Sequence, residues 1–202
     1  SVEILTRLVT GYPESVHMAE ARFVQAESFS ELGKYAEAIV IFDEVINKYP
    51  ESDFVGPAWG RKGDCQFQLG SEDPKRYESS IESYSVVAKI SSLSLDLVMQ
   101  AEYTIGRSME KTGKIDEALE QYYTKVIVRY FEDRDKGVWH SEGSKVWFTR
   151  AVFNAVELLQ SKKEWKGAVR LLQRLVDADV PARGEAEEKI RKIRAEHRWM
   201  LR

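Results

Sequence analysis

The sequence contains very little cysteine and histidine. Cys65 is the single cysteine among 202 residues, and the three histidines, His17, His140 and His197, lie far apart in the chain. One cysteine excludes an internal disulfide framework and a cage of cysteine ligands around a metal. The scattered histidines argue against a histidine metal cluster. We therefore expect no metal site and no cofactor.

Long apolar runs and a strong excess of one charge sign are absent as well. The 30 Lys and Arg side chains nearly balance the 33 Asp and Glu, which gives a formal net charge of −3. A nucleic-acid-binding protein would show a basic excess, so we expect no nucleic acid as a partner. No uncharged run approaches the roughly 18 apolar residues of a membrane-spanning helix, which predicts no transmembrane segment.

Residue patterns that support catalysis are not found. Cys65 has no histidine nearby in sequence to activate it, and burial as a small apolar residue is the favoured interpretation. The segment His140-Ser141-Glu142 contains the residue types of a nucleophilic triad, but neighbours in sequence rarely form the necessary geometry. No glycine-rich segment leads into a Lys-Ser or Lys-Thr pair as it does in a phosphate-binding loop. We therefore expect a protein that is not an enzyme.

The chain begins within a helical pattern. Leu5, Leu8 and Val9 fall at helical spacing, directly before a Tyr-Pro-Glu-Ser segment. We interpret residues 1–13 as the tail of a partial repeat, and the chain as one domain cut from a longer protein. Because these apolar residues lack a preceding helix to cover them, self-association through the N-terminal end is a further expectation.

A sequence pattern repeats along most of the chain. Tyr12-Pro13-Glu14-Ser15 recurs 37 residues later as Tyr49-Pro50-Glu51-Ser52, and larger shifts align further small and aromatic residues. Together with the partial repeat, the repeats occupy residues 1–181. The four complete repeats have approximate bounds of 16–50, 53–91, 96–131 and 145–181.

Each repeat predicts two helices that pack as a hairpin. In the first repeat, a helix over about 16–32 carries small residues, and a helix over about 35–48 carries an apolar stripe. Glycine separates the two helices because the left-handed conformation after a helix costs glycine little, and proline follows the second helix. The signature positions are Ala26, Gly33, Tyr35, Ala38, Phe42, Pro50, Gly63, Gly70, Gly113, Ala118, Tyr122 and Ala168.

This pattern resembles the tetratricopeptide repeat (TPR), which has a small residue in its first helix, glycine at the turn, and aromatic and alanine positions in its second helix. The resemblance implies an all-α, right-handed solenoid of helical hairpins. The Tyr-Pro-Glu-Ser spacers are similar, more narrowly, to those of bacterial envelope TPR proteins, namely the lipoprotein of the outer-membrane β-barrel assembly machinery and the periplasmic partner of the Tol–Pal system. That similarity implies the bacterial periplasm or cell envelope as the location.

The last segment, residues 182–202, differs in composition from the repeats. Its apolar residues recur at helical spacing, which predicts a helix that caps the end of the solenoid. A basic amphipathic helix is also typical of proteins that bind membranes or acidic partners, but four glutamates on this helix favour the capping role. The apolar face consists of Ala186, Ile190, Ile193, His197 and Met200.

The resemblance further implies that a peptide or a segment of a partner protein binds in the groove lined by the first helices. Aligning the repeats places Phe23, Gly60, Tyr103 and Phe153 at one equivalent groove-facing position. The aromatic residues are candidates for apolar pockets, and nearby polar residues for binding carboxylates or amides. In an alternative interpretation, the aromatic residues only pack between helices. The candidate partner-binding residues are Phe23, Arg61, Tyr103, Arg107, Arg150, Phe153 and Asn154.

Two other features bear on the partner. The clamp with which some TPR proteins bind acidic peptide tails is not reproduced, because Glu27, Gln100 and Thr104 occupy matching positions. A loop predicted over 131–144 carries large apolar residues, which we expect to fold back onto the repeats. The expected function is a non-enzymatic protein-interaction module. The alternative is a structural spacer or self-association element of a larger bacterial envelope protein.

Overall fold

The computed structural model describes Arg7, Gly11, Ser15 and residues 17–138, 140–178 and 180–197. All regular secondary structure in these residues is helical, which confirms the all-α prediction. None of the helices in the described residues is long and apolar enough to cross a membrane. The partial repeat predicted over 1–13, with its self-association surface, lies outside the described residues apart from Arg7 and Gly11.

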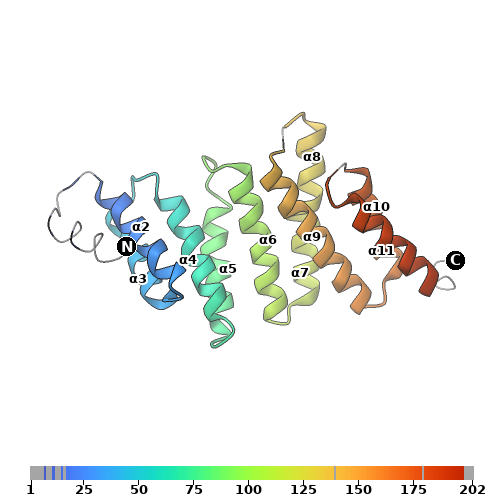
Figure 1. Ribbon diagram of the computed structural model, residues 1–202, viewed down its shortest axis with the longest axis horizontal. Helices are drawn as coiled ribbons and strands as arrows, with labels where there is room; N and C mark the ends of the chain where they lie inside the picture. Colours follow the sequence, from blue (N-terminus) through green and yellow to red (C-terminus); the bar gives the residue numbers. More distant parts are fainter. Residues whose placement is uncertain are drawn as a thin grey trace. The chain divides into compact units, whose positions relative to one another are not determined.

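Helices follow one another along the described chain (Figure 1). The first complete repeat, predicted as helices over about 16–32 and 35–48, contains helices with closely similar bounds. In chain order the helices are α2 (Met18–Glu31), α3 (Tyr35–Lys48), α4 (Val55–Leu69), α5 (Lys75–Val87), α6 (Leu95–Lys111), α7 (Ile115–Gln121), the π-helix η1 (Tyr122–Val128), α8 (Arg129–Asp135), α9 (Glu142–Ser161), α10 (Trp165–Asp177) and α11 (Arg183–Glu196).

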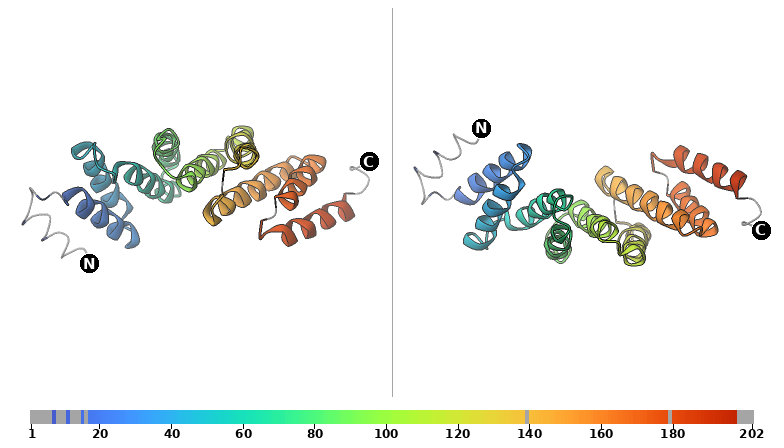
Figure 2. Two further views of the ribbon diagram at one scale, coloured as in Figure 1. Left: turned by 90° about the horizontal axis from the view of Figure 1, so that it is seen from above. Right: turned by 90° about the horizontal axis from the view of Figure 1, so that it is seen from below.

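The chain divides into two compact units, residues 1–113 and 114–202. In the N-terminal unit, α2 packs against α3, α3 against α4, α4 against α5 and α5 against α6. In the C-terminal unit, α9 packs against η1 and α10, and α10 packs against α11. Figure 2 shows the helices of each unit side by side in this order.

The core of each unit contains residues that recur at two equivalent positions of the second helices. We call the first set, of small residues, the alanine column, and the second set, of large and mostly aromatic residues, the aromatic column. The alanine column, which Ser80 interrupts in α5, is fully buried, and the hydroxyl of Ser80 donates a 3.0 Å hydrogen bond to the carbonyl oxygen of Gly63. This bond offsets the cost of burying a polar group in the hairpin of α4 and α5. The buried columns are Ala38, Ala118 and Ala168, and Phe42, Tyr84, Tyr122 and Leu172.

The turns between paired helices follow two different geometries. Gly33 and Gly113 have φ angles of 72° and 77°, the left-handed region that favours glycine. Gly70 differs, with a φ of −59°, because the insertion that follows it reshapes the turn. A side chain at Gly70 would collide with the ring of Tyr77, so close packing, not backbone conformation, requires a glycine there. Lys163 occupies the left-handed position in the fourth repeat, with a φ of 59°.

Replacing Lys163 by glycine is expected to stabilise the protein by about 0.5–1 kcal/mol. The left-handed conformation costs a residue with a side chain roughly 1–2 kcal/mol, and the greater freedom of glycine in the unfolded chain offsets only part of the gain. Thermal denaturation of both proteins measures the difference. The control is Lys162→Gly: Lys162 has a φ of −81°, so no strain is relieved, and the loss of its ion pairs with Asp116 and Glu164 adds to the expected decrease in stability. Equal stability changes for the two variants would contradict the prediction.

The predicted loop over 131–144 is wrong in its first part. Helical structure continues through η1 and α8 to Asp135, so the connection to α9 is shorter. Aromatic packing explains the extension: the ring of Tyr130 stacks on Phe148 at 4.0 Å, and Phe131 packs edge-on against Phe148 at 5.5 Å. His140 is buried and donates a 2.9 Å hydrogen bond to the carbonyl oxygen of Tyr130. Among the described residues of this segment, Phe131 and His140 therefore fold back onto the helices as predicted, whereas Val138 is 44% exposed and does not.

The C-terminal helix α11 covers α10. Ala186, Ile190 and Ile193 are buried, on the face predicted from their spacing. The imidazole of His197, just after this helix, stacks on the indole of Trp165 with ring centroids 3.6 Å apart. The described part of the predicted face is thus directed at the last hairpin, as expected for a helix that caps it.

Candidate functional site

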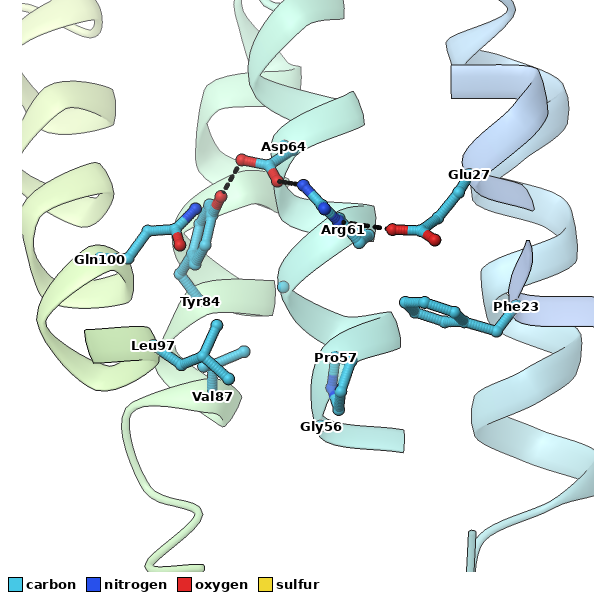
Figure 3. Close-up of a pocket in the computed structure, with 11 residues that line it drawn as sticks. Phe23, Glu27, Gly56, Pro57, Arg61, Asp64, Tyr84, Val87, Leu97 and Gln100 are labelled. Atoms are coloured by element: carbon cyan, nitrogen blue, oxygen red, sulfur yellow. Dashed lines mark hydrogen bonds and ion pairs between the residues drawn. The ribbon is translucent and has the colours of Figure 1, made fainter. Parts of the chain in front are cut away.

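A cavity of about 320 Å³ opens in the N-terminal unit between the first helices of the repeats. Figure 3 shows Phe23 on α2 at one side, Pro57 and Arg61 on α4 between, and Leu97 and Gln100 on α6 at the other side. One part of the wall is apolar and consists of Phe23, Pro57, Val87 and Leu97. The side chain of Leu97 is 38% exposed, so part of this apolar wall is open to solvent.

The cavity exists because α4 carries glycine where neighbouring repeats carry an aromatic side chain. Gly60 aligns with Phe23 in the first repeat and with Tyr103 in the third. A Cβ atom at Gly60 would meet only Cγ2 of Val87, at 4.0 Å, so the space beside this glycine is open. The third glycine of this helix differs: a Cβ atom at Gly63 would lie 2.7 Å from the ring of Tyr84. The two glycines therefore have opposite roles, one leaving a space and the other allowing close packing.

A polar network forms the other part of the wall. Nε of Arg61 donates to a carboxylate oxygen of Glu27 at 3.1 Å, and Nη1 of Arg61 lies 3.6 Å from a carboxylate oxygen of Asp64. The hydroxyl of Tyr84 donates to the other oxygen of Asp64. Partial burial raises the pKa of the Asp64 carboxyl, and the bonds from Tyr84 and Arg61 lower it by less. The ionised carboxylate is therefore only partly compensated for its lost hydration.

A second hollow, of about 410 Å³, adjoins the first along the same helices. Both hollows share Glu27, Arg61, Asp64 and Gln100, and the second adds Glu31 on α2 and Gln68 on α4 among other polar residues. Together they form one continuous surface with an apolar end and an acidic end, which we call the α2–α4–α6 groove. The amide groups on its walls supply donors and acceptors that suit a peptide backbone.

Two of the predicted partner-binding residues line this groove. Phe23 borders the cavity and also packs against Phe42 and Phe54, with ring centroids 5.7 and 5.2 Å apart. Phe23 therefore packs between helices and also borders the open space of the cavity. Arg61 also borders the cavity, held by Glu27 and Asp64.

The two other candidates in the N-terminal unit lie on α6. Tyr103 and Arg107 are half-buried. Arg107 donates from Nη1 to Glu110 at 2.9 Å on its own helix. Neither residue is part of the cavity wall formed by Leu97 and Gln100, which lie earlier on α6.

The remaining three candidates are in the C-terminal unit. The guanidinium of Arg150 lies over the ring of Trp147 at 4.7 Å. The ammonium of Lys189, on α11, lies over the ring of Phe153 at 5.4 Å. The amide of Asn154 is 3.5 Å from the hydroxyl of Tyr122. Each of these side chains therefore has a contact within its own unit.

The C-terminal unit has a hollow of about 560 Å³, on α7, α9 and α10. Its wall carries charged side chains beside the apolar Leu119, Leu159 and Leu171. Two of the charged groups have partners: Arg174 donates to the hydroxyl of Tyr123 at 3.3 Å, and a carboxylate oxygen of Asp116 lies 2.5 Å from Nζ of Lys162. Neighbouring exposed charges of this kind are typical of a solvated helix surface. The N-terminal cavity is the stronger candidate site, because it lies between the first helices of consecutive repeats, where the sequence predicts the groove.

Sequence reasoning missed Pro57, Leu97 and the meaning of Gly60. The alignment places Gly60 at the groove-facing position of Phe23 and Tyr103, and a glycine within that aromatic column was the available signal for open space. Leu97 carried no signal, because an apolar residue in the first turn of a helix is ordinarily part of the core.

Comparison with known proteins agrees with the geometry of the hairpins. The sequence profile of the tetratricopeptide repeat matches residues 20–52 and 100–130. No curated protein matches the chain. The chain superposes on the crystal structure of nearly identical TPR-like repeats from a Podosopora anserina protein described as a kinesin light chain, with a TM-score of 0.63 and 14% identity, covering 88% of this chain and 84% of that one.

Two further solved structures have the same fold. A point variant of the Podosopora anserina repeats gives a TM-score of 0.63 at 15% identity and covers 98% of this chain and 86% of that chain. The ArsTM double mutant of MamA RS-1 gives a TM-score of 0.57 at 14% identity, with 88% of this chain and 84% of that chain covered. Likeness at such low identity concerns the fold.

These observations define a class: an all-α protein built from helical hairpins, of the kind that generally serves as a non-enzymatic protein-interaction scaffold. Within that class, the fold is that of TPR-like repeats, and two segments of the chain match the tetratricopeptide repeat itself.

Proposed function

We propose that this protein binds a segment of a partner protein in the α2–α4–α6 groove. The single observation that carries the proposal is the cavity beside Gly60, with the exposed side chain of Leu97 on its wall. Concave sites with apolar walls and a few convergent polar groups are the ordinary form of a binding site. The groove supplies both parts on the rigid first helices of consecutive repeats.

The groove suits an extended or helical segment because its two ends differ in chemistry. The apolar end can bury a side chain of the partner, where burial of a large apolar side chain contributes about 1.5–3 kcal/mol. The polar end offers the carboxylates and the amide of Gln100 to the partner's main chain and charged groups. A flat or uniformly charged surface would not orient a segment in this way.

Photo-crosslinking tests the location of the binding site. A photoreactive amino acid in place of Leu97 is expected to crosslink a partner in a lysate of the source organism, because this position borders the cavity. The matched control places the same amino acid at Val40, which is 61% exposed on α3 and is not part of the groove. Crosslinking from Val40 but not from Leu97 would place the binding surface elsewhere and contradict the proposal.

A further inference from the structure

The cavity beside Gly60 has the position of a missing side chain. Gly60 occupies the repeat column that holds Phe23 and Tyr103, and the space it leaves is bordered by Phe23, Pro57 and Val87. A Cβ atom added to Gly60 would come no closer than 4.0 Å to its nearest neighbour. A large apolar group entering from outside can therefore occupy this space without displacing the helices. An apolar occupant would remove the side chains that line this space from contact with water, which favours binding.

The groove is acidic beside this apolar space. Its walls carry three carboxylates, on Glu27, Glu31 and Asp64, against one guanidinium, on Arg61. Arg61 is already shared between Glu27 and Asp64. A carboxylate from a partner that approached the remaining donors of Arg61 would lie beside Glu27 and Asp64, and like charges at an interface disfavour binding. A cation from a partner, by contrast, would be attracted by these carboxylates.

The electrostatic environment of Asp64 also favours a positively charged group on the partner. Burial raises the pKa of this carboxyl, and the bonds from Tyr84 and Arg61 only partly oppose the shift. The ionised form of Asp64 therefore gains from an additional positive charge nearby. Glu31, at the acidic end of the groove, is exposed and adds to the negative potential.

We propose that the partner segment is cationic and places one large apolar side chain in the cavity beside Gly60. The positive charge comes from Lys or Arg residues close to that side chain in the partner's sequence, which face the carboxylates of the groove. This inference rests on the proposed function and adds the chemistry of the partner to it. It departs from the binding of acidic peptides, which would need unpaired basic side chains on the groove wall.

A random dodecapeptide display library is the probe for this chemistry. The wild-type protein is expected to select peptides that combine a large aliphatic or aromatic residue with Lys or Arg. The Gly60→Leu variant fills the cavity from within and is expected to lose this selection. Gly60→Ala is the matched control, because a single methyl group leaves most of the cavity open. Selection of acidic peptides by the wild type, or equal selection by Gly60→Leu, would overturn the proposal.

Individual peptides from the selection measure the two contributions separately by fluorescence polarisation. Replacing the apolar residue by alanine is expected to weaken binding by roughly 10–100-fold, the equivalent of burying one such side chain. Changing the adjacent Lys or Arg to Glu is expected to weaken it by at least about tenfold, and the effect should shrink at high salt. An unchanged affinity in either case would overturn the corresponding half of the proposal.

A second variant keeps the experiment decisive if Gly60→Leu fails to fold. Leu97→Ser changes an exposed side chain of the cavity wall, so folding is expected to be retained while selection for the apolar residue weakens. Glu31 is also exposed, and the Glu31→Gln variant is expected to weaken the binding of cationic peptides only.

The outcome also separates this inference from the proposed function. Crosslinking from Leu97 together with a selection that lacks apolar or cationic residues, or that yields no peptide, would overturn the inference and leave groove binding intact. If Leu97 gives no crosslink and the selection yields no apolar and cationic peptides, both the proposed function and this inference are overturned.

Discussion

Phe148→Ala is expected to destabilise the C-terminal unit by about 3–5 kcal/mol. Phe148 is fully buried on α9, stacked on Tyr130 at 4.0 Å and in edge contact with Phe131 at 5.5 Å. Tyr130 in turn stacks on the imidazole of His140. Removing the central ring leaves a cavity between α8 and α9, and the surrounding rings lose the surface against which they pack.

Urea denaturation combined with hydrogen exchange measures this effect. Exchange of the amides of α8 and α9 should accelerate in Phe148→Ala, because local opening costs less free energy. The control is Val146→Ala on the same helix, where the side chain is 45% exposed and a change within about 0.5 kcal/mol is expected. Similar effects of the two substitutions would show that the aromatic stack does not hold this region together.

Repeat spacing is the reason that the hairpins could be predicted from the sequence. Each helix of the first repeat lies within about two residues of its predicted bounds, since proline and glycine mark the ends of the apolar pattern. The pattern works because each repeat buries the same positions against its neighbour. Ala38, Ala118 and Ala168 are fully buried at equivalent places in three repeats.

The pattern fails where packing outside the repeat decides the structure. Charged residues over 132–135 indicated a loop, yet α8 continues to Asp135 because the adjacent rings of Tyr130 and Phe131 pack on Phe148. The π-helix over Tyr122–Val128 has no sequence signal that we recognise. Likewise, the fourth repeat keeps a left-handed turn although Lys163 replaces glycine, because the flanking helices determine that geometry.

The candidate site was predictable only in part. Alignment of the repeats placed Phe23 and Arg61 on the groove side, where both border the cavity. It could not show that Glu27 holds Arg61, since an ion pair between α2 and α4 depends on how the helices pack. The pair of Arg61 with Asp64, by contrast, follows from their i,i+3 spacing on α4. This pairing changes the expected partner: a guanidinium between two carboxylates is poorly placed to bind a partner's carboxylate.

Gly63→Leu is expected to destabilise the N-terminal unit by roughly 3 kcal/mol, at the upper end of the usual cost of overpacking. A Cβ atom at this position already comes within 2.7 Å of the Tyr84 ring. Tyr84 has no room to move, because it is 1% exposed and its hydroxyl is bonded to Asp64. The carbonyl oxygen of Gly63 also accepts the hydrogen bond from Ser80, so separating α4 from α5 to admit a side chain breaks a buried hydrogen bond as well.

Gly60→Leu, one turn earlier on the same helix, provides the matched comparison. Here the side chain enters open space, and leucine is favoured over glycine within a helix by up to about 1 kcal/mol. We therefore expect this variant to be at least as stable as the wild type, by thermal denaturation of the three proteins under one condition. Equal destabilisation by both substitutions would mean that the space beside Gly60 is closed in solution. The same result would remove the cavity on which groove binding rests, whereas the opposite behaviour of the two glycines would establish that α4 combines a tight contact with an open site.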